Sequence, residues 1–501
     1  MSDRRVRDFT EGSIPRHLVS FAVPMLLGNL LQALYNTVDA IWVGRFLGHQ
    51  ALAAVSVGFP IIFALVALVI GITMATTVLV SQYFGARRPD QVVRTVNNSL
   101  LLLTVTGVAV SVLGIAFRRP LLRVINCPPE IIDTAASYLG IFMAGIVFMF
   151  LFNAAGAILR GLGDSRTPLR FLAYATGLNI VLDPVFIFGL GPLPALGAAG
   201  AALATVLAMA VSAVISLRYL YVTSGIVTYQ PGSFGLDWEL TKLTFRIGLP
   251  AGIQMVLVSL SAVVVSSFVN RFGSVVVAGF GAGTRLDQFA FMPSMSIGVA
   301  VSSLVGQNLG AGRVQRVGET VRWAVLISGG ITFLVALVAF FKPDILLVLF
   351  TGDPSVLAEG GLYLRYMALA YVPLALMFVM SGVLRGAGDT VPAMVFTFIS
   401  LWVIRVPLAH YLSSLSGLGV TGIWTAIATS PYVGLLLYYA YYRSGRWQTK
   451  VVTRRRGPEE PGRTGERGGS EEPGAAEAPD RVEEPRGAAH AQTGQGARQR
   501  S

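Results

Sequence analysis

The chain has little cysteine and little histidine. Its 501 residues include one cysteine, Cys127, and four histidines. A single cysteine excludes an intramolecular disulfide and any Cys-rich metal site. The histidines share no spacing typical of metal ligands, and no Asp-Asp-x-x-Asp motif is present to hold a magnesium pyrophosphate. We therefore expect no cofactor and no enzyme activity.

Charge is also scarce, and much of it is confined to one end. Charged residues make up 13% of the chain, against about 25% in a soluble domain. The segment 443–501 holds 12 Lys+Arg and 9 Asp+Glu, so the preceding 442 residues are depleted further. This excludes a soluble enzyme, a disordered protein and a nucleic-acid partner. The net charge of +12 lies mainly in short loops, as in membrane proteins.

Long apolar segments occupy the rest of the chain. A membrane-spanning helix needs about 20 mostly apolar residues, and a barrel would instead show alternating segments of about ten. The sequence predicts an all-α integral membrane protein in the lipid bilayer with twelve spans. Their expected ranges are 17–44, 52–81, 92–117, 131–159, 168–190, 196–221, 241–269, 276–306, 317–341, 357–384, 391–413 and 418–442.

Loop charges predict the orientation. With both termini in the cytoplasm, most loop arginines and lysines lie on that side, and only the cluster Arg118–Arg123 conflicts. We expect a monomer in the cell inner (plasma) membrane. Residues 1–16 form the cytoplasmic N-terminus. Residues 443–501, rich in Gly, Pro, Glu and Arg, should be a disordered and dispensable cytoplasmic tail.

The chain contains an internal duplication. Four anchors recur in the same order about 225 residues apart. They are Pro24 and Pro250, Arg45-Phe46 and Arg271-Phe272, Gln82-x-x-Gly85-Ala86 and Gln307-x-x-Gly310-Ala311, and Leu159-Arg160-Gly161-x-Gly163-Asp164 and Leu384-Arg385-Gly386-x-Gly388-Asp389. This predicts two six-helix lobes, 17–222 and 239–442, joined by a linker, 223–238. Six spans each make the repeats parallel around a central cleft, which favours alternating access.

These motifs resemble the MATE (multidrug and toxic compound extrusion) family over residues 14–442. Within the family, Asp39 and the motif Asn179-x-x-x-Asp183-Pro184 are most similar to the branch named after DNA-damage-inducible protein F. The resemblance implies an antiporter that exports small organic, often cationic, compounds in exchange for protons or sodium. Another branch carries a glutamate in helix 7, where this chain has Val258. Coupling is therefore expected in the N-terminal lobe.

The first predicted helix carries a polar stripe. Gln32, Tyr35, Asn36 and Asp39 recur at helical spacing on an otherwise apolar segment. Lipid does not solvate such a stripe, and an acid inside the membrane is a functional candidate. We expect Gln32, Tyr35 and Asn36 to line a substrate cavity and Asp39 to bind the coupling cation. The alternative is an interfacial Asp39 solvated by lipid headgroups.

A second acid follows in the fifth predicted helix. Asn179 and Asp183 lie four residues apart, and Pro184 frees a backbone carbonyl. With Asp39, Thr205 and the Ala201 carbonyl they form the all-oxygen set that a hard monovalent cation prefers. The resemblance implies that these positions form the cation site, with Asp39 and Asp183 as ligands if the ion is sodium. Alternatively, the Thr205 hydroxyl bonds to its own helix.

Other polar residues have weaker assignments. Tyr138, Met149 and Asn153 share a face of the fourth helix and are candidates for the substrate cavity or for ordinary packing. Asp164 and Asp389 are interpreted as structural residues that cap a helix or pair with arginine. Asp287 is the one clear intramembrane acid after helix 7, with Arg285 as its neutralising neighbour.

Arg405 leaves a second function open. It lies mid-helix near the repeat counterpart of Asp183, and with Arg365 it is the basis for the alternative of a flippase for lipid-linked saccharides or other lipids. The acids of the N-terminal lobe weigh against that alternative.

Overall fold

The structure is a computed structural model that describes residues 7–190, 194–223, 235–414 and 417–454. Among these residues, twelve helices are long and apolar enough to cross a membrane, and there is no strand. The prediction of an all-α protein with twelve spans is therefore confirmed. The predicted linker 223–238 lies mostly outside the described residues.

The first six spans are helices without breaks, and several are longer than the sequence predicted. They are α1 (Ile14–Phe46), α2 (Gly48–Gly85), α3 (Pro89–Val124), α4 (Ile132–Gly161), α5 (Arg166–Phe188) and α6 (Ala198–Arg218). A short π-helical segment, Tyr219–Thr223, extends α6. Lengths above the 20-residue minimum fit tilted spans.

The last six spans include one that is built from three pieces. They are α7 (Trp238–Val269), α8 (Ser274–Gly310), α9 (Val314–Phe341), α11 (Pro354–Gly386), the composite span 390–414 and α14 (Val420–Arg443). The composite span consists of α12 (Thr390–Phe398), a π-helical segment (Ile399–Arg405) and α13 (Val406–Ser414). A short helix, α10 (Pro343–Leu347), precedes α11 and was not anticipated.

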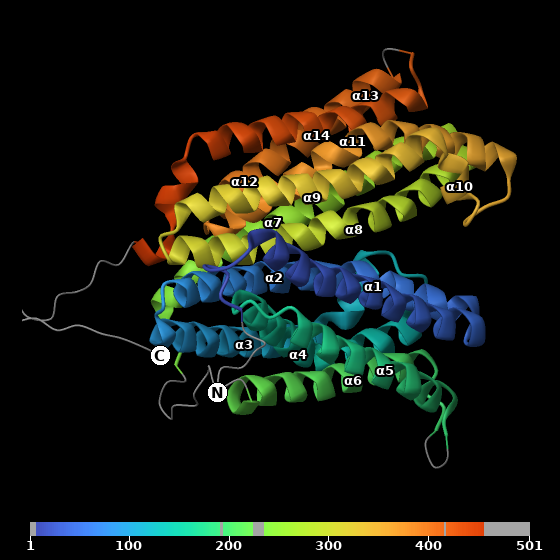
Figure 1. Cartoon of the computed structure of the whole chain (residues 1–501). Coiled ribbons are helices and arrows are strands. Elements are labelled where there is room, and N and C mark those ends of the chain that lie inside the picture. Colours follow the sequence, from blue (N-terminus) through green and yellow to red (C-terminus); the bar gives the residue numbers. More distant parts are fainter. Residues whose placement is uncertain (1–6, 191–193, 224–234, 415–416, 455–501) are drawn as a thin grey trace, which may run out of the picture. The chain divides into compact units, whose positions relative to one another are not determined.

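The start of α1, with the residues just before it, and the start of α7 each pack into the opposite half of the chain. Phe9, Ile14 and Leu18 belong to a buried core with residues of α8, α9 and α11, whereas Leu240 and Ile247 belong to the core formed by α2, α3 and α4. Figure 1 shows α1 and α2 beside α7 and α8, in agreement with the packing of α2 against both. The two halves therefore interlock where α1 and α7 begin. We name this end of the helices the arm end.

Two glycines of the repeated Gln-x-x-Gly-Ala motif explain how closely the halves approach. A Cβ on Gly85 would lie 2.0 Å from the Gln307 carbonyl oxygen, and one on Gly310 would lie 2.0 Å from the Gln82 carbonyl oxygen. Neither position has room for a side chain. The ends of α2 and α8 therefore cross backbone to backbone.

The glutamines of the same motif bond across the two halves. Gln82 Nε2 donates to the Gly386 carbonyl oxygen (2.8 Å), and Gln307 Nε2 donates to the Gly161 carbonyl oxygen (3.1 Å). Both glutamine side chains are fully buried. We name Gln82 and Gln307 the cross-lobe glutamine pair. Each connects one copy of the Gln-x-x-Gly-Ala motif to the other half's Leu-Arg-Gly motif.

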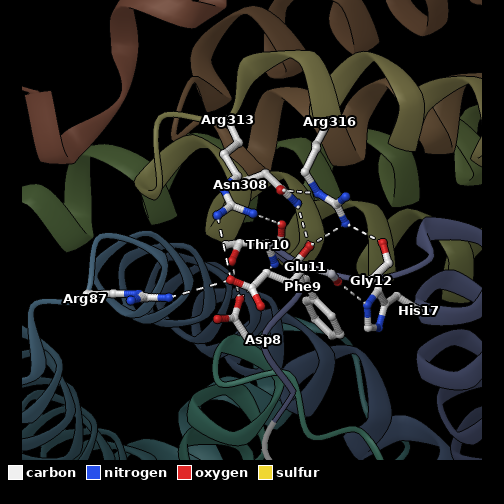
Figure 2. Close-up of polar contacts among 10 residues, drawn as sticks. All are labelled: Asp8, Phe9, Thr10, Glu11, Gly12, His17, Arg87, Asn308, Arg313 and Arg316. Atoms are coloured by element: carbon white, nitrogen blue, oxygen red, sulfur yellow. Dashed lines mark hydrogen bonds and ion pairs between the residues drawn. The ribbon is translucent and has the colours of Figure 1, made fainter. Parts of the chain in front are cut away.

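Residues 7–13, which we name the N-terminal arm, bind to the start of α9 and the end of α8 (Figure 2). The Phe9 N–H donates to Gln307 Oε1 (2.9 Å). Figure 2 shows Asn308, whose Nδ2 donates to the Phe9 carbonyl oxygen (3.3 Å). Arg316 Nη2 donates to the Gly12 carbonyl oxygen (2.9 Å). The arm therefore covers the junction of the two halves through its backbone.

A short segment after α14, residues 446–454, is the counterpart of the arm. The Val452 N–H donates to Gln82 Oε1 (2.9 Å), while Trp447 stacks on Tyr442 with ring centroids 5.5 Å apart. Trp447 and Val451 are almost completely buried. The expectation of a disordered tail from residue 443 is corrected for residues 443–454, because these aromatic and aliphatic side chains pack. Residues 455–501 lie outside the described residues.

This packing changes where the chain should tolerate truncation. A chain ending at Arg454 is expected to fold and transport normally, whereas one ending at Lys450 loses two buried valines and the partner of Gln82 Oε1. Burying a valine contributes about 1.5–3 kcal/mol, so the shorter chain should lose roughly 3–6 kcal/mol of unfolding free energy. Thermal unfolding in detergent measures this difference. Equal melting temperatures for both truncations would contradict it.

Candidate functional site

The polar stripe of α1 lines a cavity of about 500 Å³. Gln32, Tyr35, Asn36 and Asp39 all contribute to its wall, and Gln32 Nε2 donates to Asn36 Oδ1 (3.3 Å). The interpretation of Asp39 as an acid facing a cavity agrees with this geometry, and Tyr35 itself is buried. The stripe faces the cavity because helical spacing places all four side chains on one side of α1.

The other walls come from α2, α4 and α6. Tyr138 and Met149 of α4 and Thr205 of α6 line the cavity. Asn153 does not. It lines a second cavity of about 180 Å³ with Gln32 and Arg160, and its Nδ2 donates to the Met149 carbonyl oxygen (2.8 Å). The placement of Asn153 in the same cavity as Tyr138 is therefore corrected.

Asn179 and Asp183 lie on α5 and are completely buried. Asn179 Nδ2 donates to Asp183 Oδ1 (3.1 Å) and approaches Thr205 Oγ1 (3.5 Å) on α6. The four-residue spacing aligns the two α5 side chains, and Gly200 brings α6 close, since a Cβ there would lie 2.3 Å from the Phe186 carbonyl oxygen. The geometry joins Thr205 to Asn179 and not to its own helix.

Three buried carboxylate and amide oxygens in this region have no hydrogen-bond partner. They are Asp39 Oδ1, Asn179 Oδ1 and Asp183 Oδ2. Asp39 and Asp183 are near enough to repel each other electrostatically. Buried oxygens without donors carry a desolvation cost, which a bound proton or monovalent cation would relieve. We name Asp39, Asn179, Asp183 and Thr205 the N-lobe acid site.

Ala201 is placed beside this site by packing. It is buried in the first turns of α6 and packs in a small core with Val43 and Ile187. Only its backbone carbonyl can therefore serve as a ligand. Among the described residues, no three His, Cys, Asp or Glu side chains gather as they would around a metal ion. The site instead combines two carboxylates with neutral oxygens.

The second half of the chain holds a buried acid on α8 with its own partners. Asp287 accepts hydrogen bonds from the Tyr363 hydroxyl (2.5 Å) and the Tyr371 hydroxyl (2.6 Å). The cation that acts on Asp287 electrostatically is Arg405, while Arg285 is exposed. The expected neighbour, Arg285, is therefore replaced by Arg405. Arg405 is the last residue of the π-helical segment. The spacing of a regular helix therefore did not predict that Arg405 would lie near Asp287.

We expect Asp287→Asn to reduce stability but to leave the ion dependence of transport unchanged. An amide keeps one acceptor where the carboxylate has two, so one tyrosine hydroxyl loses its bond, at a cost of about 1–3 kcal/mol. Efflux is measured against pH and sodium for Asp287→Asn beside Asp39→Asn. Loss of gradient dependence in the Asp287 variant alone would place the coupling site in the second half.

The aspartates of the repeated Arg-Gly-x-Gly-Asp motif have structural partners. Asp164 Oδ1 accepts the N–H groups of Arg166 (2.9 Å) and Thr167 (3.0 Å) and so caps α5. Asp389 Oδ2 accepts from the Tyr441 hydroxyl (2.6 Å), and its side chain makes no cap. The two acids occupy equivalent motif positions but have different partners.

Several cavity residues were not anticipated from the sequence. The additional lining residues are Ala40, Val43, Leu52, Val55, Ser56, Ile62, Phe142, Gly145, Ile146, Val206 and Met209. Most are apolar, and apolar side chains in a membrane helix look alike whether they face lipid or a cavity. Ser56 is the polar residue among those that α2 contributes to this list, and its hydroxyl donates to the Leu52 carbonyl oxygen (2.7 Å).

Comparison with known proteins gives matches over most of the chain. The family model MatE matches residues 24–185 and 250–411. The probable multidrug resistance protein YpnP of Bacillus subtilis is 34% identical over 445 residues, which cover 88% of this chain and 97% of that protein. The FAD transporter of Shewanella oneidensis is 28% identical over 86% of this chain and 95% of its own length.

Solved structures agree with the same fold. A structure described as MATE in the bent conformation has a TM-score of 0.83 and 26% identity, and it covers 90% of this chain and 99% of its own. A structure described as the outward-facing conformation of a multidrug resistance MATE family transporter of the MOP superfamily has a TM-score of 0.81, with the same identity and coverage. The family match and these two structures support one assignment.

Proposed function

The chain belongs to the MATE family, whose members are membrane transporters and not enzymes, and on this premise we propose that it is a cation-coupled antiporter exporting organic compounds. The observation that carries the proposal is the N-lobe acid site beside the 500 Å³ cavity. Asp39 belongs to both, so one carboxylate is within reach of a coupling cation and of a substrate.

The coupling follows from charge. With both carboxylates ionised, Asp39 and Asp183 repel each other in a poorly solvated region. A proton or a sodium ion bound there removes the repulsion and changes which packing of α1, α5 and α6 is favoured. Export requires the cation and the substrate to prefer opposite states of the transporter. A cationic substrate can also compete with the coupling ion for Asp39.

The cavity walls support an organic cation as the substrate class. A volume of about 500 Å³ falls within the range of sites for drug-sized ligands. Tyr138 and Phe142 offer aromatic surfaces, and Met149 and Met209 offer adaptable apolar ones. Among the described residues, Asp39 is the one acid that lines the cavity. Names of relatives such as multidrug resistance protein fit this chemistry.

The flippase alternative has less support. It needs a cationic cleft for phosphate, built from Arg405 and Arg365. Arg405 Nε donates to Ser430 Oγ (2.8 Å) and interacts with Asp287, whereas Arg365 is exposed. Neither arginine lines the 500 Å³ cavity.

We place both termini in the cytoplasm of a monomeric transporter. The arm end, where the two halves interlock, is then the cytoplasmic end, and the state is outward-facing. The loop charges support this orientation. The likeness to a structure described as outward-facing supports this state.

The test is dye transport in proteoliposomes of the full-length protein. Ethidium movement is followed with a proton gradient alone, a sodium gradient alone, and neither. We expect transport with one gradient and none without, and collapse of that gradient with an ionophore should stop it. Equal dye movement under all three conditions, at verified insertion, would overturn the antiporter proposal.

A further inference from the structure

A pocket of about 240 Å³ lies away from the N-lobe acid site, between the N-terminal arm, α1 and the start of α5. Among the described residues, three arginines line it, Arg7 from the arm and Arg166 and Arg170 from α5. Asp164 is the one acid among its lining residues. The lining therefore carries a net charge of +2. We name it the three-arginine pocket.

The described residues do not balance the positive charge in this pocket. Burial lowers the pKa of the Arg7 guanidinium, and the neighbouring guanidinium groups of Arg166 and Arg16 lower it further, while Asp164 acts in the opposite direction. Arg7 donates a hydrogen bond to Ser20 Oγ, a neutral group. No ion pair is found for Arg7, Arg166 or Arg170 among the described residues. A bound anion would offset this repulsion.

A second, independent observation points to a ligand. Thr167 lines the pocket with 2% of its surface exposed, and its hydroxyl has no hydrogen-bond partner. Its backbone N–H is already bound by Asp164 Oδ1. The hydroxyl is therefore a buried donor left available within the pocket, and such groups are rarely without a partner.

Asp164 restricts which anions can fit the pocket. Its Oδ1 caps α5, but its Oδ2 is buried without a partner. Next to this acceptor, a ligand needs an O–H group as well as a negative charge. Guanidinium groups bind phosphate oxygens through paired N–H donors. A singly charged phosphate that also carries a hydroxyl satisfies both the arginines and Asp164 Oδ2.

We propose that the three-arginine pocket binds a singly charged phosphate bearing a hydroxyl donor, either the headgroup of phosphatidylglycerol or free dihydrogen phosphate. Its position favours a headgroup, because α5 begins at Arg166 and arginines at the ends of spans lie at headgroup level. Arg166 and Arg170 are exposed at the rim, which leaves the pocket accessible.

The ligand would also hold the N-terminal arm in place. The Arg7 carbonyl oxygen lies 2.4 Å from where a Cβ of Gly163 would be, so the arm passes directly over the repeated motif. Gly163 has φ +86°, a conformation that favours glycine. A phosphate that bridges Arg7 to Arg166 would connect the arm to α5, while Phe9 and Gly12 connect it to the second half (Figure 2).

The experiment measures binding and not transport, so its outcome is independent of the proposed function. Full-length protein in detergent is titrated with inorganic phosphate. In parallel, the protein in nanodiscs of phosphatidylcholine is compared with nanodiscs containing one quarter phosphatidylglycerol. Melting temperature is followed in both arms, and native mass spectrometry counts bound lipid. The variants are Arg166→Gln/Arg170→Gln and, as a milder change, Thr167→Val.

We expect the melting temperature of the wild type to rise and saturate as the probe is added. The apparent affinity obtained from this titration should be at least tenfold weaker for the double variant. Stabilisation by phosphatidylglycerol alone identifies the lipid, and equal stabilisation by inorganic phosphate identifies the free ion. Arg88→Gln/Arg123→Gln, which removes the same charge at exposed positions elsewhere, should behave as wild type. No stabilisation by either probe, or the same weakening in this control, would overturn the proposal. If the double variant misfolds, Thr167→Val is the deciding variant. Binding of phosphate or phosphatidylglycerol by Thr167→Val as tight as by the wild type would then overturn the proposal.

Discussion

Asp39→Asn and Asp183→Asn are each expected to reduce gradient-driven export to background while the protein still folds and inserts. Both side chains belong to a site with unpartnered buried oxygens, Asp39 Oδ1 and Asp183 Oδ2. An amide keeps nearly the same shape but carries no charge, so it removes the repulsion that a cation relieves. If the cation no longer binds one state more tightly than the other, its gradient cannot shift the equilibrium between the two states or drive export.

The two variants should differ in substrate binding. Asp39 lines the cavity, whereas Asp183 is completely buried behind it and is not among the lining residues. We therefore expect Asp39→Asn to weaken binding of a cationic dye such as ethidium in the absence of a gradient, and Asp183→Asn to change it little. Fluorescence titration of the purified variants measures this difference.

Asp90→Asn is the matched control for both. Asp90 is an exposed acid in the first turn of α3, so the same change there should leave efflux and binding as in the wild type. Normal efflux by both site variants at wild-type expression would refute a coupling role for the N-lobe acid site.

The fold could be predicted largely from hydrophobic length, because lipid imposes one requirement on every span. The features that were missed depend on local geometry and not on composition. The π-helical segment Ile399–Arg405 reads as an ordinary apolar helix, and its extra residues per turn rotate Arg405 relative to a regular helix. The residues around Trp447 begin a segment, 443–501, that is rich in charged residues. The composition of the whole segment predicted disorder, although its first residues pack.

The candidate site could be predicted where polarity was out of place. A row of polar residues on α1 and an acid before Pro184 both contradict an apolar surrounding, and the structure brings Asn179, Asp183 and Thr205 together. Partners from distant segments could not be inferred. Asp287 contacts Tyr371 across 84 residues, and no pattern within one helix encodes that pairing.

The duplication shows a different limit of sequence analysis. Gln82 and Gln307 were identified as repeat counterparts, but a repeat indicates equivalent positions and not what they contact. Their partners, Gly386 and Gly161, come from the opposite halves of the chain. The motif's role in joining the halves became visible only in three dimensions.

Gln82→Leu and Gln307→Leu are therefore expected to open the arm end and to impair transport severely. Each leucine approximates the shape of glutamine but leaves a carbonyl oxygen and an N–H without their bonds, Gly386 and Val452 in one case and Gly161 and Phe9 in the other. A buried group without its bond costs about 1–3 kcal/mol, so each variant should disfavour the interlocked state by roughly 2–6 kcal/mol. A shift of about 5.5 kcal/mol reverses a 99:1 population.

Distances between spin labels separate this effect from simple unfolding. Labels at Arg88→Cys and Glu319→Cys, both exposed near the arm end on opposite halves, are attached in a Cys127→Ala background and measured by pulsed electron paramagnetic resonance. We expect one short distance in the unmodified pair and a longer population in each leucine variant, larger still in the double variant. Gln315→Leu, at an exposed glutamine on α9, should leave the short distance unchanged. Because the two glutamines join different segments to the same junction, either variant alone should lengthen the distance. An unchanged short distance together with normal transport in both would show that the interlocked arm end does not depend on these bonds.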